Sequence, residues 1–371
     1  MRPYGRTTNV DCDEDAALRL HYVRGLRLAR GANYTRIAGA SMFESLTIRG
    51  LTLTPARVCA PLAEITHSAF RRLLGDFGGC GAHFTEMLAG KKLLKEDLAR
   101  SPYCKRHPSE KRLIYQLMLT PDDPIEAIIE KISTASPDGI DLNLACYAPV
   151  IRRLDACSQL FENMPALARV LQTVRRCWAG PLSVKIRLGS SALGNEERFV
   201  ERLRVIEDSG VDAITLHTRF FEDKFKRRSR HELFAWATAQ TRLPIIANGD
   251  ILGTSTLLTH PAHFQSVSGI MIGRMAVARP WLFAGWHAPV AVDYSEVWRR
   301  LLGYIAEDFA PNVAMRRFRL FTKYYARNFH FGHTLTMAIH NAPTLEAMRE
   351  RGDAFFGVAQ PVFETPCMQG L

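Results

Sequence analysis

The sequence predicts an α/β fold of the (β/α)8 TIM-barrel type, followed by a small C-terminal helical domain. From Leu51 onward, eight short apolar runs alternate with longer amphipathic stretches, which is typical of repeated strand–helix units around a parallel sheet. After Pro280 this alternation ends and only helix-like periodicity remains. A barrel takes about 250 residues, so a chain of 371 residues has room for a barrel and a smaller unit. A doubly wound sheet is the alternative arrangement.

The predicted strands are apolar runs of five to seven residues, with helical stretches between most of them. They are Val58–Leu62, His83–Met87, Leu113–Met118, Gly139–Ala145, Leu182–Leu188, Ala213–Arg219, Leu243–Asn248 and Gly269–Gly273. The count of eight is that of a closed barrel.

Three stretches between the strands carry helix signals. Asp122–Ser133 has acidic residues in its first turn, which suits the helix dipole. Pro165–Cys177 has a proline near its start. We expect Asn195 to cap the helix Asn195–Ser209, which should stop before Gly210. The helices predicted after the barrel are Tyr294–Phe309, Asn312–His330 and Leu335–Phe356.

These elements divide the chain into three predicted parts. They are a basic N-terminal extension (1–50), a barrel (51–290) and a helical domain (291–371). The net charge of +11 favours a polyanionic partner such as nucleic acid, although a solvated basic surface explains it equally well.

Several protein classes are disfavoured by composition. No apolar run reaches the roughly 20 residues that a membrane-spanning helix needs, and the N-terminus lacks the apolar core of a signal peptide. The eight cysteines form no C-x-x-C pair, which argues against a zinc or thioredoxin-type site and for reduced thiols. We therefore expect a cytoplasmic protein with no membrane partner and no bound metal.

In a (β/α)8 barrel the carboxyl ends of the strands face one shared opening, here called the barrel mouth. In chain order, the residues predicted to lie there are Pro61, Leu62 and Ala63; Glu86; Gln116; Asn143 and Cys146; Lys185 and Arg187; His217 and Arg219; Asn248, Gly249 and Asp250; Gly273 and Arg274. The loops after the last two strands are the usual phosphate site of this fold. There glycine lets backbone N–H groups approach an anion, and arginine adds a charged fork.

Three of these residues have two interpretations each. Cys146 is either a core thiol or a thiol that takes part in chemistry. Lys185 stands between two apolar residues of a strand that should be buried, where an ammonium group is unfavourable unless paired. It either neutralises the negative edge of a reduced flavin or pairs with Glu86 across the barrel. His217 is either a satisfied core histidine or a cofactor contact.

The predicted helix Asn312–His330 is dense in basic and aromatic residues, namely Arg316, Arg317, Arg319, Lys323, Tyr324, Tyr325 and Arg327. This mixture suits phosphate contacts and base stacking on RNA. The alternative is an amphipathic helix with Phe318, Leu320 and Phe321 inward and a solvated basic outer face.

Seven short motifs resemble those of the tRNA-dihydrouridine synthases, flavin enzymes with an FMN-binding barrel and a C-terminal helical domain. The motifs are Ala60–Thr66, Tyr115–Leu117, Asn143–Cys146, Val184–Gly189, Leu216–Arg219, Asn248–Asp250 and Ile272–Arg274. Their order and spacing are specific, and the similarity runs from about Leu51 to Phe356. No G-x-G-x-x-G fingerprint follows a strand, which fits a family that holds FMN tightly and meets NADPH transiently.

The resemblance implies a role for each matched position. The residues implied to contact the flavin ring are Pro61, Leu62, Ala63, Gln116, Lys185 and His217. Those implied to hold its ribityl chain and phosphate are Asn248, Gly249, Asp250, Gly273 and Arg274. Cys146 would be the general acid that protonates C5 of a uracil, with Asn143 and Arg187 holding the base. NADPH would be the reductant, tRNA the substrate, and the enzyme a monomer.

The sequence departs from the family pattern around Cys146. Ala145 and Tyr147 stand where many members have Gly and Pro, and the loop 153–159 lacks the usual glycines. Cys157, on the same loop, is a second candidate for the acid.

Two further departures are Glu64, in place of a glycine, and Phe225, where many members carry Tyr. Two other functions therefore fit the sequence. One is a flavin oxidoreductase of the same barrel acting on a free small molecule such as a pyrimidine. The other is a non-catalytic RNA-binding descendant.

Overall fold

The computed structural model describes residues 42–192, 194–223 and 226–368. The chain separates into two compact units, 1–42 and 43–371, and the second contains both the barrel and the C-terminal helices. The predicted division at residues 50 and 290 stays a prediction. Most of the predicted N-terminal extension, and Phe225, lie outside the described residues.

Eight parallel strands form the barrel, and each matches a predicted strand to within a few residues. They are β3 (Arg57–Cys59), β4 (His83–Phe84), β6 (Leu113–Met118), β7 (Gly139–Asn143), β8 (Leu182–Arg187), β9 (Ala213–His217), β10 (Ile245–Asn248) and β11 (Gly269–Ile272). A short strand, β5 (Leu88–Ala89), also pairs with β6.

The strand order excludes the doubly wound alternative. Neighbouring strands follow chain order from β4 to β11, and β11 pairs in parallel with β3. Between β3 and β4 the amide of Gly81 donates to the carbonyl of Arg57 (2.8 Å), and that of Cys59 to Ala82 (3.3 Å). The sheet thus closes on itself, whereas a doubly wound sheet reverses its order midway.

An antiparallel hairpin, β1 (Leu46–Ile48) and β2 (Leu51–Leu53), precedes the barrel and was not predicted. Both residues of its turn have positive φ, 42° at Arg49 and 80° at Gly50, as the type I′ turn of two-residue hairpins requires. Ile48 and Leu53 join a buried cluster with residues at or near the amino ends of barrel strands, including Ala82, Ile114 and Ala213. The hairpin therefore packs on the barrel interior from the end opposite the barrel mouth.

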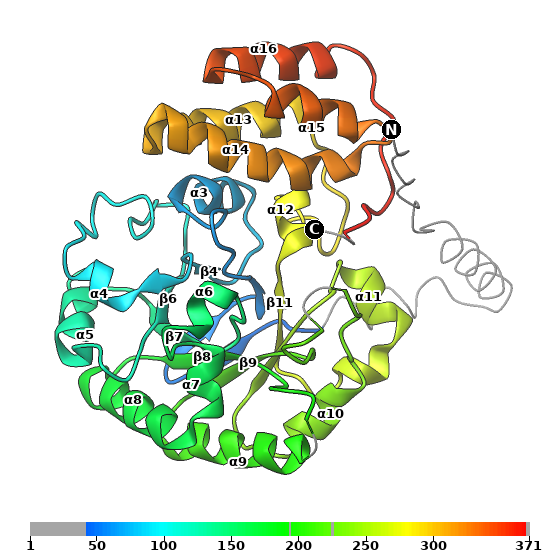
Figure 1. Ribbon diagram of the computed structural model, residues 1–371. Coiled ribbons are helices and arrows are strands. Elements are labelled where there is room, and N and C mark those ends of the chain that lie inside the picture. The colour runs from blue at the N-terminus through cyan, green and yellow to red at the C-terminus, as the bar shows by residue number, and fades with distance from the viewer. Residues whose placement is uncertain (1–41, 193, 224–225, 369–371) are drawn as a thin grey trace, which may run out of the picture. The chain divides into compact units, whose positions relative to one another are not determined.

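Short and long helices connect the strands (Figure 1). They are α3 (Ser68–Phe77), α4 (Gly90–Leu93), α5 (Ile125–Ser133), α6 (Pro149–Arg152), α7 (Ser158–Glu162), α8 (Met164–Cys177), α9 (Asn195–Asp208), α10 (Leu233–Thr238), α11 (Thr254–Thr259), η1 (Pro261–Phe264) and α12 (Arg274–Ala278). The predicted cap of α9 is wrong, because Gly194, at φ 71°, is the N-cap residue. The Asn195 side chain instead donates to the Leu188 carbonyl (2.9 Å).

The helices after the barrel are α13 (Tyr294–Asp308), α14 (Pro311–Tyr325), η2 (Ala326–Asn328), α15 (Gly332–His340) and α16 (Leu345–Phe356). The predicted helix Leu335–Phe356 is thus two helices. Pro343 lacks a backbone N–H and cannot continue α15. Thr344 then caps α16 by accepting from the amide of Ala347 (3.1 Å).

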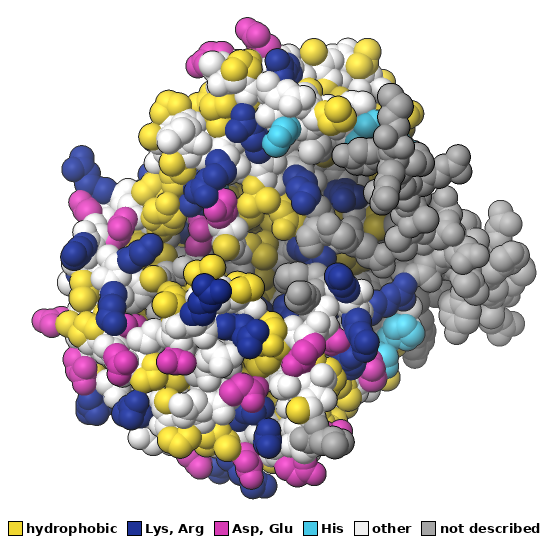
Figure 2. All heavy atoms as spheres, in the orientation of Figure 1, with side chains coloured by type: hydrophobic (Ala, Val, Ile, Leu, Met, Phe, Trp, Pro, Cys, Tyr) yellow, Lys and Arg dark blue, Asp and Glu magenta, His cyan; other side chains and the backbone are white. Residues whose placement is uncertain are grey.

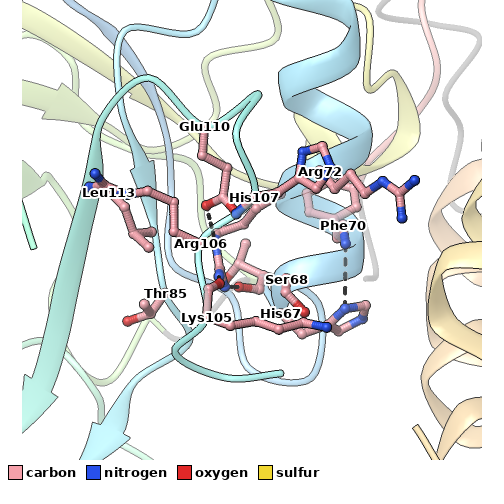
Figure 3. Close-up of polar contacts among 12 residues, drawn as sticks. His67, Ser68, Phe70, Arg72, Thr85, Lys105, Arg106, His107, Glu110 and Leu113 are labelled. Atoms are coloured by element: carbon pink, nitrogen blue, oxygen red, sulfur yellow. Dashed lines mark hydrogen bonds and ion pairs between the residues drawn. The ribbon is translucent and has the colours of Figure 1, made fainter. Parts of the chain in front are cut away.

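The helical region packs on the barrel through α3 and α12, which contact α13 and α14. Figure 3 shows the polar residues at the start of α3 and in the loop 105–110 beside it, including His67 and Glu110. The buried Arg71 side chain forms an ion pair with Glu110 (2.7 Å). Lys105 forms another with Asp308 at the end of α13 (2.5 Å). This loop therefore links α3 to the helical region. None of the described helices is both long and apolar enough to cross a membrane.

Candidate active site

The parallel ladder brings the predicted residues of the middle strands to two adjacent levels of the barrel. In register, Asn143 lies beside Lys185, Arg187 beside His217, and His217 beside Asn248. Figure 2 shows Lys and Arg side chains around hydrophobic ones on one face of the molecule, between the helical region and the barrel.

Lys185 does not pair with Glu86, so that alternative is wrong. Glu86 instead accepts from Arg317 of α14 (2.6 Å) and from the amide of Glu64 (2.7 Å). The Lys185 side chain is buried and forms no hydrogen bond or ion pair with any described residue. Burial, and then the nearby charge of Arg187, lower the pKa of Lys185 to about 8. An anionic group beside this ammonium would stabilise its charged form.

The loops after β9 and β10 hold a network of charges. Asp250 accepts from Arg219 (2.6 Å) and from Arg274 (2.8 Å), and Arg219 also contacts Nε2 of His217 (2.9 Å). Burial, and then the charges of Lys185, Arg187 and other arginines, hold the pKa of His217 well below its ordinary value. His217 is therefore neutral near pH 7. Asp250 positions two arginines, although it was predicted to contact the ribityl chain or phosphate itself.

Gly249 fills a position that no other residue could occupy without displacement. It has φ +112°, and a Cβ there would lie 2.2 Å from Oγ of Ser229 and 2.5 Å from Cδ2 of His217. At Gly273 a Cβ would meet only Ala60 and Leu62, at 3.5 and 3.8 Å. The buried Oγ of Ser229 has no hydrogen-bond partner among the described residues. The close approach at Gly249 and this unsatisfied hydroxyl fit a polar ligand in the barrel mouth.

Asn143 holds the turn that carries Cys146. Its Oδ1 accepts from the amides of Ala145 and Cys146, both at 3.0 Å. Its Nδ2 donates to Oε1 of Gln116 (2.9 Å), and Nε2 of Gln116 donates to Asp141 (2.7 Å). Asp141 is fully buried and was not among the predicted site residues. A carboxylate inside an apolar strand was the signal that could have identified it.

The two candidate thiols have different surroundings. Cys146 is partly exposed, whereas Cys157 is fully buried and its sulfur contacts that of Met87 (3.6 Å). Burial raises the pKa of Cys157 well above the ordinary value of a thiol. Tyr147 stacks on Phe221 with ring centres 5.1 Å apart. This geometry favours Cys146 over Cys157 as a proton donor to a bound molecule.

The remaining predicted contacts surround the same opening. Arg187 is buried and its Nη1 donates to the carbonyl of Phe220 (3.4 Å). Pro61 and Leu62 are half-buried and Ala63 is exposed. Asn248 donates to the carbonyl of Met271 (2.8 Å), which joins β10 to β11 and uses one of the two N–H groups of its amide.

The basic residues of α14 are largely engaged within the molecule. Arg317 is buried against Glu86, and Arg316 pairs with Glu64 (2.7 Å). Arg319 donates to the Ala342 carbonyl after α15 (2.8 Å). Lys323 is exposed, and Arg327, in η2 directly after α14, is half-buried. The predicted basic face of this helix is thus smaller than the sequence indicated, while Phe318 and Phe321 are buried as expected.

A closed parallel barrel with cationic and acid–base groups at the carboxyl ends of its strands is the architecture of an enzyme. A family model described as dihydrouridine synthase (Dus) matches residues 58–350. The chain belongs to this family of oxidoreductases, which confirms the resemblance seen in the sequence.

Individual relatives agree with the family model. The tRNA-dihydrouridine synthase B of Proteus vulgaris is 31% identical over 230 residues, covering 61% of this chain and 69% of that protein. The tRNA-dihydrouridine synthase B of Yersinia pestis is 29% identical over 318 residues, or 80% of this chain and 95% of that protein. Among solved structures, histamine dehydrogenase from Rhizobium sp. 4-9 aligns with a TM-score of 0.50 and 13% identity, over 66% of this chain and 47% of that chain. That similarity is one of fold.

Proposed function

We propose that the protein reduces specific uridines of tRNA to 5,6-dihydrouridine, with FMN as its cofactor and NADPH as the reductant. The observation that carries this proposal is the buried ammonium group of Lys185, which has no partner in the described part of the chain and lies in a barrel mouth where Gly249 leaves no room for a Cβ. When bound, FMN supplies the reducing equivalents. Family membership supports the reaction type.

The chain's own residues have separate tasks in this proposal. Lys185 and Gln116 hold the polar edge of the flavin, and neutral His217 lies beside it. The backbone at Gly249 and the guanidinium of Arg274 hold the phosphate, with Asp250 orienting Arg274. Ser229, which was not predicted, adds a free hydroxyl to this phosphate site.

Around the substrate, Arg187 stabilises negative charge that develops on a uracil carbonyl oxygen. Cys146 donates the proton to C5, because its thiol is partly exposed and lies on the loop that follows β7. The target base must leave its stack to reach these groups. The helical region, with Lys323 and Arg327, contacts the tRNA backbone.

A free pyrimidine as substrate is the alternative, favoured by the engagement of Arg316, Arg317 and Arg319 within the molecule. The test measures dihydrouridine after incubating the purified protein with NADPH and either unmodified tRNA transcript or free uridine. Product in tRNA alone supports the proposal, and product in free uridine alone supports the alternative. A protein that binds no FMN on reconstitution contradicts both and favours a non-catalytic role. The predicted cytoplasmic location and monomeric state stay predictions.

A further inference from the structure

A hydrogen-bonded chain of side chains runs from the buried carboxylate of Asp141 to the backbone at Cys146. Asp141 accepts from Nε2 of Gln116 (2.7 Å), Oε1 of Gln116 accepts from Nδ2 of Asn143 (2.9 Å), and Oδ1 of Asn143 accepts from the amide of Cys146 (3.0 Å). The other oxygen of Asp141 accepts from Oγ of Ser183 (2.6 Å). The chain thus joins Gln116, Asn143 and Cys146, which have roles in the proposed function, to Asp141, which has none.

The direction of this chain is fixed at both ends. An ionised carboxylate can only accept hydrogen bonds, and a backbone N–H can only donate. Gln116 must therefore turn its N–H₂ end toward Asp141, and Asn143 must turn its carbonyl end toward the Cys146 amide. A side-chain amide can otherwise adopt either of two flipped orientations.

We propose that Asp141 is a positioning residue that sets the orientation of both amides, and thereby the turn carrying Cys146 and the amide edge that Gln116 presents to the flavin. The second part rests on the proposed function. Asp141 acts through Gln116 and Asn143 rather than by touching substrate. Its cross-strand neighbours on β6 and β8, Gln116 and Ser183, donate hydrogen bonds to it, and Lys185 of β8 is a positive charge that interacts with it.

Substitutions at Asp141 separate its role as a hydrogen-bond acceptor from its charge. In Asp141→Asn, Oδ1 can still accept from Gln116 while the new N–H₂ group donates to Oγ of Ser183, because a hydroxyl accepts as well as donates. The orientations of Gln116 and Asn143 are then kept. Asp141→Leu removes the acceptor and leaves both amides free to flip. In Asp141→Asn/Asn143→Asp, the carboxylate at position 143 accepts from both the Cys146 amide and Gln116, so only Gln116 is flipped. Ser183→Ala is the matched control, because it removes a hydrogen bond to Asp141 without removing the acceptor of Gln116.

The experiment follows alkylation of Cys146 by iodoacetamide, quantified by peptide mass spectrometry, together with FMN affinity, in the full-length protein. We expect Asp141→Leu to raise the alkylation rate at least fivefold, because the turn loosens, and to weaken FMN binding at least tenfold. Asp141→Asn, which keeps an acceptor for Gln116, should stay within twofold of the parent in alkylation and within threefold in FMN binding. The double variant should alkylate within twofold of the parent but bind FMN at least tenfold more weakly, because Gln116 is flipped. Ser183→Ala should change the alkylation rate less than twofold.

A parent-like alkylation rate in Asp141→Leu would overturn the inference. So would parent-like FMN binding in the double variant. If Asp141→Leu does not fold, the other two variants decide: parent-like alkylation in both, with weak FMN binding in the double variant alone, supports the inference, and any other result contradicts it. Failure of the parent to bind FMN would contradict the proposed function, while the alkylation comparison would still test the role of Asp141.

Discussion

At the scale of single residues, the active site contains a buried charged side chain, that of Lys185, whose burial lowers the stability of the protein unless an anionic ligand is bound. The side chain of Lys185 is 9% exposed, and burial lowers its pKa to about 8. Its folded pKa lies below that of a free lysine, 10.5, so the charged form destabilises the folded protein at neutral pH. By linkage this penalty is of the order of 3 kcal/mol below pH 8, and it disappears as the pH rises toward the ordinary pKa.

Lys185→Met should therefore raise the melting temperature of the FMN-free protein and weaken FMN binding at least tenfold. In the parent, FMN affinity should decrease as the pH rises above about 8, because the ammonium that faces the ligand is lost. The measurements are thermal denaturation without FMN and FMN titration from pH 7 to 9.5. Lys95→Met, at an exposed lysine, is the control and should change neither. A less stable Lys185→Met protein would contradict this account.

Cys146→Ala should keep FMN binding and NADPH oxidation but lose reduction of tRNA by about 100-fold or more, the usual contribution of a general acid. Cys157→Ala is the matched control on the same loop. Because Cys157 is buried, its loss should lower stability by about 1 kcal/mol and leave the rate of tRNA reduction within a few-fold. Dihydrouridine formation under single-turnover conditions is the measurement. Equal rates in Cys146→Ala and the parent would place the acid elsewhere.

At the scale of elements, the loops that follow the strands decide where a ligand can approach. The loop after β10 turns at Gly249 with positive φ, directly against His217 and Ser229. The loop after β11 turns at Gly273 with φ −104°, outside the left-handed region, and a Cβ there would meet its neighbours only at ordinary contact distances. Both glycines follow strands and look alike in the sequence. Only the first has both a positive φ and surroundings that exclude a Cβ.

This difference predicts unequal effects of the same substitution. Gly249→Ala should shift His217 or the loop after β10 and abolish most FMN binding. Gly273→Ala should weaken FMN binding only a few-fold. FMN titration monitored by flavin fluorescence, with circular dichroism to verify folding, makes the comparison. The prediction is wrong if the two variants lose affinity equally.

At the scale of the whole molecule, a buried ion pair joins the barrel to the helical region. Arg317 of α14 donates to Glu86 beyond β4 and lies over the rings of Phe309 and Tyr103, with its guanidinium 4.5 and 5.1 Å from their centres. Burial raises the pKa of Glu86, while the charge of Arg317 opposes this shift. The predicted RNA-facing arginine is thus a structural residue at the joint between the two regions.

Arg317→Met should lower the free energy of unfolding by about 3–5 kcal/mol, because it leaves a buried carboxylate without its partner. Arg317→Met/Glu86→Gln should recover part of this loss, as expected for coupled residues. Arg316→Met is the control: its pair with Glu64 is exposed (58% and 38%), and such pairs contribute only about 0–1 kcal/mol. Urea denaturation measures all three variants. A double variant no more stable than Arg317→Met would show that the pair is not coupled.

Local sequence patterns determined the strand count, most helices, the barrel and the family, because burial periodicity and short motifs depend on neighbouring residues. They also located Gln116, Asn143, Lys185 and His217 in the carboxyl-terminal halves of their strands. The roles assigned to the site residues stay predictions until the variants are measured.

Only the tertiary structure decided which groups are partners. Glu86 and Arg317 are 231 positions apart, and Asp141 meets Gln116 across neighbouring strands. The hairpin β1–β2, too short to show a periodicity, is held by the barrel residues it covers. A charged or amide group forms a hydrogen bond with a partner that the fold places within about 3 Å. Which groups come that close depends on how the whole chain folds and not on their separation in the sequence.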